Sequence, residues 1–537
     1  MGLASDLRSF AGTLFPWLNR RVELRARWGL AGEENAFRAS RYFDFTRRLA
    51  GRGALVDDKT WSDLEFPAFF RALDTAITPI GRQYLFHQLR TYEFDQEEIG
   101  RRHQAYQALG AHRDLREDIQ LALQPMAIDS AAHIADLLLG PEPEKVPLQH
   151  LVVPCMLLAI AAIPASIAHL APLWVCSIPF LINMFIARKV DAKLGTSVGA
   201  LLDCGRMLAA ANRLAALQSP VDIPYLHRLR AEVELRSELR SQVRSLGWLD
   251  AVRNSQAGGL AVIADLLFLL KFALYGRSIE RFLRTRTRWL STFELIGAVD
   301  ASIAVAGFLH RYAQHCRPTV VDEPEIRIEQ GYHPFIAQPV KNSISLTGHS
   351  ALVTGSNMTG KTTFIKMVAM NVVLGHTLGV CLADRVILPR SPVRALIHGD
   401  QSVETGKSRY FAEAEAIRDF VQEAASGGCR IFILDEPFSG TNTVERVAVA
   451  KAVLRAIGLH AQALVTTHDV ELQHLLGEKF ELFYFQEDPA VEGFFDHKLH
   501  AGASTQRNAI RVLERLGYPA PVIAEALATV AAVGKAP

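Results

Sequence analysis

A glycine-rich segment places the strongest constraint on the fold of this chain. The run ALVT at residues 351–354 leads into GSNMTGKTT at 355–363, and the apolar run FIKMVAMNVV follows. Glycines permit a tight backbone turn, so this order predicts a strand, a loop and a helix. Further runs such as RIFILDEP and ALVTTHD alternate with helical segments beyond residue 317. The alternation predicts an α/β domain at 317–537, with a parallel sheet covered by helices.

The loop also matches the spacing GxxxxGK[ST], which is typical of phosphate-binding loops. Backbone N–H groups of such a loop converge on phosphate oxygens, and the following helix presents its positive end. Lys361 is expected to reach the β- and γ-phosphates, and the Thr362 hydroxyl to ligate Mg²⁺, so the predicted ligands are ATP and Mg²⁺. The expected nucleotide-binding residues of the loop are Gly355, Ser356, Asn357, Met358, Thr359, Gly360, Lys361, Thr362 and Thr363.

Two later strands are expected to deliver catalytic groups to the same edge of the sheet. The run IFIL ends in Asp435 and Glu436, and ALVTT ends at His468. Asp435 is predicted to hold Mg²⁺ together with Thr362, and Glu436 to act as the base that activates water. His468 is expected to contact the γ-phosphate or the attacking water. The predicted catalytic residues are therefore Lys361, Glu436 and His468.

A second anion-binding pattern lies between these motifs. Gly406 and Ser408 stand just before a helix that is expected to begin near Tyr410. A helix N-terminus attracts anions, and one domain does not need two phosphate sites for one nucleotide. The segment is therefore predicted to serve the ATP of a neighbouring subunit in a homodimer. The alternative interpretation is a capped helix without a ligand.

Residues 51–316 show helical spacing of apolar residues and are expected to form an all-α domain ahead of the α/β domain. Residues 1–50 form a basic helical segment, which is either a solvated face or a contact for anionic lipid or nucleic acid. The formal net charge of +2 gives no overall attraction to nucleic acid. Six scattered cysteines without a CxxC pair indicate no zinc site.

One stretch of the helical half departs from a soluble profile. Residues 151–187 contain no Asp, Glu, Lys or Arg, and Arg188 and Lys189 follow directly. The stretch is too long for one membrane span, and its prolines divide it, with a turn expected at 169–172. It predicts a transmembrane hairpin, with the ATPase in the cytoplasm and attached to the cell membrane. The alternative is a buried pair of helices.

Several segments together resemble the MutS family of ATPases. GSNMTGKTT resembles its phosphate loop, TGKSRYFAEA (405–414) its signature segment, DEPFSGTNT (435–443) its carboxylate motif and TTHD (466–469) its histidine motif. GYHPFI (331–336) resembles the segment near the adenine, which implies a nucleotide contact for His333. In the helical half, residues 72–92 and 295–308 resemble the start and the end of the MutS core domain. DHKLHAGAS (496–504) resembles a late strand and glycine turn of the family.

The resemblance implies a helical core and lever domain followed by an ATPase domain that binds ATP at a dimer interface. It also implies DNA as a partner. No segment resembles the mismatch-reading domain of the family, and the apolar residues 151–187 interrupt the helical half. Two functions therefore stay open: a MutS-like ATPase that acts on DNA, and a membrane-tethered ATPase whose lever acts on a protein or membrane partner. A transporter ATPase is disfavoured because the LSGGQ signature is absent.

Overall fold

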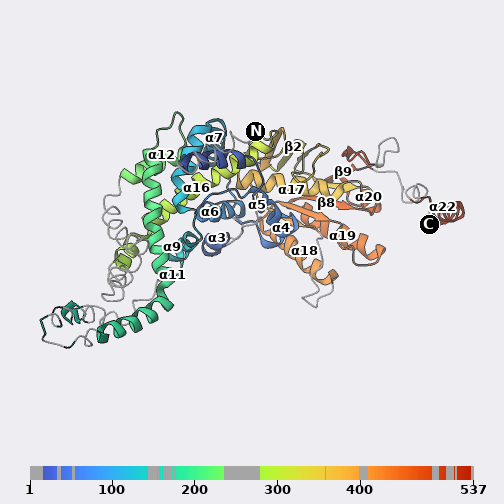
Figure 1. Cartoon of the computed structure of the whole chain (residues 1–537). Coiled ribbons are helices and arrows are strands. Elements are labelled where there is room, and N and C mark those ends of the chain that lie inside the picture. The colour runs from blue at the N-terminus through green and yellow to red at the C-terminus, as the bar shows by residue number, and fades with distance from the viewer. Residues whose placement is uncertain are drawn as a thin grey trace. The chain divides into compact units, whose positions relative to one another are not determined.

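The computed structural model, shown in Figure 1, divides into two compact units. Unit 1 comprises Met1–Ala50, Phe70–Gln88 and Gln104–Arg311, and unit 2 comprises Gly51–Phe69, Leu89–His103 and Tyr312–Pro537. The structure describes residues 16–32, 38–50, 55–142, 177–234, 278–356, 358–397, 409–486, 495–503 and 517–533, residue 513 and single residues between 154 and 172. The chain thus combines helices with mixed sheets, as an α/β ATPase domain requires. The order of an all-α domain followed by an α/β domain stays a prediction, because two early segments group with the sheets.

The described part of unit 1 is helical, and α16 (Arg286–Arg311) is its central helix. Every residue from Leu295 to Leu309 is buried, since α8, α9, α11 and α12 all pack against α16. A helix that is apolar on all sides belongs inside a core. The main helices of the unit are α2 (Pro16–Arg27), α3 (Arg41–Thr46), α6 (Pro79–Arg90), α8 (Arg113–Leu123), α9 (Ile134–Leu139), α11 (Ser177–Ala216) and α12 (Pro224–Glu234).

One buried carboxylate joins the two core-domain segments of unit 1. Asp300 of α16 accepts hydrogen bonds from the backbone N–H groups of Ile77 and Thr78 and from the Thr78 hydroxyl, at 3.1, 2.8 and 2.6 Å. These donors stand at the start of α6, where a helix leaves N–H groups without intrahelical partners. A Cβ atom at Gly81 would lie 2.3 Å from the carboxylate, so glycine is required there. Residues 72–92 and 295–308, which the family resemblance connected, are therefore in direct contact.

Part of the basic N-terminal segment is neutralised inside unit 1. Arg25 makes two hydrogen bonds to Glu117 of α8, at 2.7 and 3.0 Å, and Arg21 contacts Glu117 at 3.3 Å. Hydrogen bonds from Arg25 and Arg113 lower the pKa of Glu117 to about 2. Of the two interpretations for residues 1–50, a contact with lipid or nucleic acid therefore cannot rely on Arg21 and Arg25 as free cations.

The predicted membrane hairpin lies largely outside the described residues. Ala168 and His169 form a turn, and from Ser177 onward the chain belongs to the 40-residue helix α11. Among the described residues, the helix that is long and apolar enough to span a membrane is α16, and it is 94% buried over that window. The hairpin at 151–187 stays a prediction.

The described part of unit 2 contains two sheets. The larger has the strand order β10-β9-β4-β8-β7-β6, in which β10 is antiparallel to β9 and the other pairs are parallel. The smaller has the order β1-β5-β2-β3. The strands are β1 (Thr319–Val321), β2 (Glu325–Gly331), β3 (Asn342–Thr347), β4 (Ser350–Thr354), β5 (Arg385–Pro389), β6 (Val393–Leu396), β7 (Ile431–Asp435), β8 (Gln462–Thr467), β9 (Phe480–Tyr484) and β10 (His500–Ala501).

Helices cover the larger sheet of unit 2. Ile417 and Phe420 of α18 and Leu454 of α19 form one core with Phe432 and Leu434 of β7. Helix α17 contacts β6, β7 and β8 as well as β2 of the smaller sheet. Alternate residues of a strand point to opposite faces of the sheet, so α17 packs on the face that α18 and α19 do not cover. The helices of this unit are α4 (Asp58–Asp63), α17 (Lys361–Thr377), α18 (Arg409–Ser426), α19 (Thr443–Gly458), α20 (Glu471–Leu475) and α22 (Ala520–Val533), and α5 (Phe66–Leu73) and α7 (Gln96–Ala111) are shared with unit 1.

Side chains from early residues cap the outer edge of this sheet. The N–H groups of Val393, Ala395 and Ile397, at a spacing of two, donate to the Tyr92 hydroxyl, the Thr60 hydroxyl and the Asp63 carboxylate. The three distances are 3.4, 3.0 and 2.7 Å. In an edge strand, every second residue directs its N–H group away from the sheet, and these three residues have that spacing. Tyr92 and α4 therefore take the place of a further strand beside β6.

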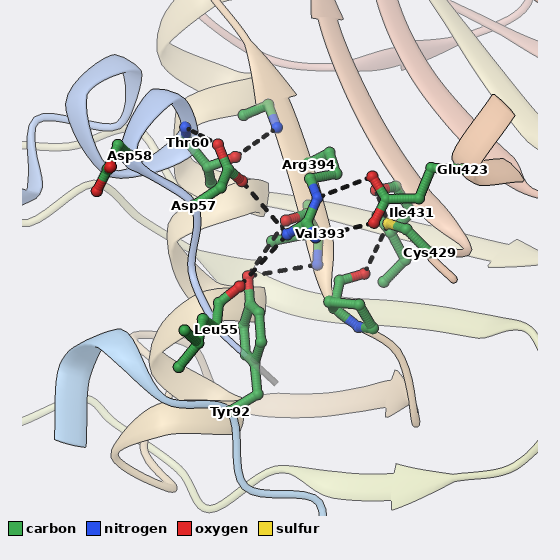
Figure 2. Close-up of polar contacts among 12 residues, drawn as sticks. Leu55, Asp57, Asp58, Thr60, Tyr92, Val393, Arg394, Glu423, Cys429 and Ile431 are labelled. Atoms are coloured by element: carbon green, nitrogen blue, oxygen red, sulfur yellow. Dashed lines mark hydrogen bonds and ion pairs between the residues drawn. The ribbon is translucent and has the colours of Figure 1, made fainter. Parts of the chain in front are cut away.

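Arg394 ties the same edge to α18 (Figure 2). Its guanidinium makes two hydrogen bonds to Glu423, at 3.0 and 2.8 Å, and one to Asp57 at 3.3 Å. Only 9% of the Arg394 side chain is exposed, so these partners offset the cost of burying its charge. We refer to Asp57, Thr60, Asp63, Tyr92, Arg394 and Glu423 as the edge clamp.

Candidate functional site

The phosphate-loop segment lies between β4 and α17, as the sequence predicts. Gly355, Met358 and Gly360 have φ angles of 147°, 72° and 109°. Such positive angles bend the loop tightly enough to carry it over the start of the helix. Gly360 is the N-cap of α17, and the helix begins at Lys361. The free N–H groups and the positive end of α17 thus lie beside the loop.

Lys361 is turned back into the loop. Its Nζ donates to the carbonyl oxygens of Gly355 and Ser356, at 2.8 and 3.0 Å. The nearest carboxylate oxygen, on Glu436, is 3.8 Å away. Burial lowers the pKa of Lys361 from its usual value, while the negative charges of Glu436 and Asp435 act in the opposite direction. A buried ammonium group of this kind provides a strong site for phosphate oxygens.

Asp435 at the carboxyl end of β7 and Thr362 at the start of α17 are neighbours. The Thr362 hydroxyl donates to Asp435 Oδ2 at 2.9 Å, and the Thr466 hydroxyl donates to Oδ1. No cluster of three or more His, Cys, Asp or Glu side chains that could hold a metal occurs among the described residues. Mg²⁺ does not need such a cluster, because it is commonly held by one carboxylate, a hydroxyl, waters and phosphates. The donors present therefore fit Mg²⁺ beside a nucleotide.

Glu436 and His468 face each other next to Lys361. His468 Nε2 is 2.6 Å from Glu436 Oε1, and both side chains are about one-third exposed. Nζ of Lys361 lies 3.4 Å from the same histidine nitrogen. Glu436 has a φ angle of 47°, and its N–H donates to the carbonyl oxygen of Thr466 at 3.1 Å. The predicted catalytic residues Lys361, Glu436 and His468 thus converge.

Two side-chain contacts hold the turns that carry these groups. Glu413 of α18 accepts the N–H of Phe438 at 2.5 Å, two residues after Glu436. Arg446 of α19 makes two hydrogen bonds to Asp469, at 2.8 and 2.5 Å, directly after His468. Helices α18 and α19 therefore fix the backbone on both sides of the Glu436–His468 pair.

A cavity of about 390 Å³ opens beside the loop, and the predicted residue His333 lines it. His333 is 7% exposed, and burial lowers its pKa, which favours the neutral form of the ring. Thr359 is buried, and its hydroxyl donates to the carbonyl oxygen of Ser356 at 2.8 Å. The remaining lining combines apolar and polar groups, including Ile336, Val340, Asn342, Met358, Gly360, Lys361, Thr362, Thr363, Met367, Glu436 and His497.

The sequence analysis missed two residues of this cavity. His497 donates from Nδ1 to the carbonyl oxygen of Thr359 at 3.0 Å. The Asn342 amide donates to His497 O at 3.0 Å and accepts the Leu499 N–H at 2.8 Å. Asn342 thus holds the late segment against the phosphate loop. The segment 496–504 resembles a late segment of the family, but nothing in its local spacing marks His497 as a cavity residue.

Three of the predicted site residues lie outside the described residues. They are Asn357 of the phosphate loop, and Gly406 and Ser408 of the second anion-binding pattern. Helix α18 begins at Arg409, next to the expected start near Tyr410.

The parallel sheet and the glycine loop at the start of α17 define the class of α/β domains that hold phosphate groups at a strand–loop–helix turn. Residues 351–533 match the family model of MutS domain V. The DNA mismatch repair protein MutS of Natronomonas pharaonis is 28% identical over 260 residues, which is 46% of this chain and 30% of the relative. The MutS protein of Thermus aquaticus is 28% identical over 280 residues, or 50% of this chain and 34% of the relative.

These matches support a relationship between the chain and the MutS family, and residues 351–533, which lie in unit 2, are similar to MutS domain V. The matched region spans only about a third of the length of these curated relatives.

Proposed function

We propose that this protein is a MutS-like ATPase that binds ATP with Mg²⁺ in unit 2 and hydrolyses its γ-phosphate bond. The cavity beside His333 would take the nucleoside, and the loop N–H groups would bind the phosphates. Lys361 would then exchange its contacts with Gly355 and Glu436 for phosphate oxygens. Thr362 and Asp435 would hold Mg²⁺, which screens the charge that develops on the phosphates.

In this proposal Glu436 removes a proton from the attacking water. His468 lies 2.6 Å from its carboxylate and would orient that water toward the γ-phosphate. The observation that carries the proposal is the convergence of Lys361, Glu436 and His468 with the Thr362–Asp435 pair. Lys361 and Thr362 stand at the start of α17, which follows β4, and the other groups stand at the ends of β7 and β8, the next two strands of the same parallel sheet.

The test is phosphate release by the purified full-length protein with ATP, in Mg²⁺ and in EDTA. Turnover in Mg²⁺ that EDTA abolishes would support the proposal. Absence of nucleotide binding in a folded protein, with and without detergent, would refute it.

We also propose that two chains share each ATP site. The support is the predicted anion pattern at Gly406 and Ser408, which the chain's own phosphate loop does not need. Lys361→Ala and Ser408→Ala proteins should each be inactive alone and regain part of the activity when mixed, because one hybrid site is intact. No recovery despite demonstrated subunit exchange would mean that hydrolysis occurs within one chain.

DNA is the partner that the names of the relatives suggest, since they are DNA mismatch repair proteins. We propose DNA binding at the level of this family relationship, without mismatch specificity. Titration of a labelled duplex and a branched DNA at several salt concentrations tests it, because phosphate contacts weaken steeply with salt. Binding that is absent at low salt, or that does not respond to salt, would reject DNA as the partner.

A membrane-tethered ATPase is the second candidate, and a specific observation favours it. The first turns of α11 expose large apolar side chains, with Leu181 55% and Phe185 57% exposed. Leu157, Leu158 and Ile160 are exposed to a similar extent. Large apolar side chains that are exposed to this extent are typical of a surface that a partner or lipid covers. Recovery of the full-length protein in the soluble fraction after a carbonate wash would end this proposal.

A further inference from the structure

Two cysteines of unit 2 face each other across an isolated antiparallel bridge. The N–H of Cys316 donates to the carbonyl oxygen of Cys381 at 2.9 Å, and the N–H of Cys381 donates to the carbonyl oxygen of Cys316 at 2.8 Å. Residues that exchange both hydrogen bonds have Cα atoms about 5.5 Å apart, with side chains on the same side. Disulfides form between Cα atoms about 4.4–6.8 Å apart, so the backbone already meets this requirement.

The two thiols are also in contact and differ in environment. A hydrogen bond from the Cys381 thiol lowers the pKa of Cys316, while burial raises the pKa of Cys381. Cys316 is partly exposed and Cys381 is fully buried. The thiolate is the reactive form of cysteine, so the accessible Cys316 is the sulfur that meets an oxidant first.

We propose that Cys316 and Cys381 form a reversible disulfide when the protein meets a hydroperoxide. The Cys316 thiolate attacks the peroxide oxygen, the O–O bond breaks, and the departing hydroxide takes up a proton and leaves as water. Cys381 then attacks the sulfur of the resulting sulfenic acid, and the S–O bond breaks. The hydroxide released takes the Cys381 proton. Two thiols and one hydrogen peroxide thus give one disulfide and two molecules of water.

The position of the pair gives this modification a structural consequence. Cys316 stands three residues before β1, and Cys381 follows the end of α17, the helix that begins at Lys361. The Cys381 sulfur also lies 3.4 Å from the carbonyl oxygen of Asn371 in α17. The disulfide would fasten the start of the smaller sheet to the segment that closes α17.

The other cysteines of the described residues provide internal controls. Cys204 belongs to unit 1, and burial raises the pKa of its thiol. In unit 2 the Cys429 sulfur donates to the carbonyl oxygens of Pro392 and Ile431, both at 3.2 Å, and burial raises its pKa to about 12. Both thiols are expected to stay reduced.

The test is brief treatment of the full-length protein with hydrogen peroxide, followed by denaturation, thiol titration and peptide mapping. The chain has six cysteines, so the thiol count should fall from six to four, with one linked peptide pair that contains Cys316 and Cys381. Dithiothreitol should restore all six. Cys316→Ser and Cys381→Ser should each abolish the linked pair, whereas Cys429→Ser should retain it.

Other outcomes would overturn the proposal. One is a linked pair that involves different cysteines. Another is conversion of Cys316 to sulfinic acid without a linked peptide in a protein whose circular dichroism is unchanged. The proposal would also be overturned if the thiol count stays at six at a peroxide concentration that oxidises a free cysteine peptide.

Discussion

The edge clamp and the catalytic end lie on the same sheet of unit 2, but their buried polar groups are paired differently. The catalytic end is the part of unit 2 that holds Lys361, Thr362, Asp435, Glu436 and His468. At the edge, the N–H groups of Val393 and Ala395 in β6 and of Ile397 just after it have side-chain acceptors, and Arg394 has two carboxylate partners. At the catalytic end, Lys361 is buried against carbonyl oxygens, with its nearest carboxylate 3.8 Å away. Met358 and Glu436 also hold positive φ angles there.

The difference separates stability from function. Satisfied buried groups at the edge contribute to the folding free energy, because removing any one leaves its partner desolvated. The catalytic end instead keeps a costly cation and an unfavourable backbone, features that cluster at sites which bind ligands. Substitutions at the edge should therefore change stability, and substitutions at the catalytic end should change ligand affinity and turnover.

The largest expected effect is on ATP affinity in Lys361→Ala. Loss of a charge-assisted contact with phosphate costs up to about 3 kcal/mol, so the Kd should rise about a hundredfold. The free energy of unfolding should stay the same or increase, because the substitution removes a desolvated charge. Calorimetric titration with ATP and urea unfolding measure the two quantities. Unchanged affinity, or a large loss of stability, would remove the contrast with the edge.

Arg394→Met should lower the free energy of unfolding of unit 2 by about 3 kcal/mol, since it leaves the carboxylates of Glu423 and Asp57 without their buried partner. The matched control is Arg418→Met on α18, whose ion pair with Asp419 is exposed. It should have no measurable effect. Equal urea midpoints for the two variants would show that the clamp contributes nothing to stability.

An intermediate effect should appear as acid sensitivity of unit 2. Burial lowers the pKa of His376 to about 3, so the folded state keeps this ring neutral while the unfolded state binds a proton below about pH 6.5. Stability from this group is complete above about pH 6.5 and declines toward pH 3, by about 2 kcal/mol at pH 5. Replacement of His376 by Leu should flatten the pH dependence of urea unfolding between pH 7 and 5. An equally steep dependence in the variant would assign acid sensitivity to other groups.

The smallest expected effect belongs to Thr60→Val, which keeps the shape of a fully buried side chain but removes the acceptor of the Ala395 N–H. An unpaired buried donor costs about 1–2 kcal/mol. ATP affinity should not change. Hydrogen exchange at Ala395 should become faster relative to the amides of β7, and protection equal to that of the wild type would mean that another group accepts this bond.

The contrast also shows what could be predicted from the sequence. Gly360, Lys361 and Thr362 form one contiguous motif. Asp435 and His468 stand at the ends of apolar runs that can be recognised as strands from the local sequence. Because parallel strands end at the same edge of a sheet, the sequence predicts that these residues lie close together. The edge clamp has no local signal, because Thr60 and Ala395 are 335 residues apart. His497 could not be predicted for the same reason, because its hydrogen-bond partner Thr359 is 138 residues away in the sequence. The segments 51–69 and 89–103 read as helical, but helical spacing does not tell which core a helix joins.

The most direct test of the proposed ATPase is a comparison of nucleotide binding with phosphate release in Glu436→Gln, under identical Mg²⁺ conditions. Glutamine keeps the size of the side chain and cannot accept the proton from water, so ATP binding should persist while turnover falls by about 10²–10⁴-fold. Turnover near the wild-type rate would contradict the assignment of Glu436 as the base and the proposed mechanism with it.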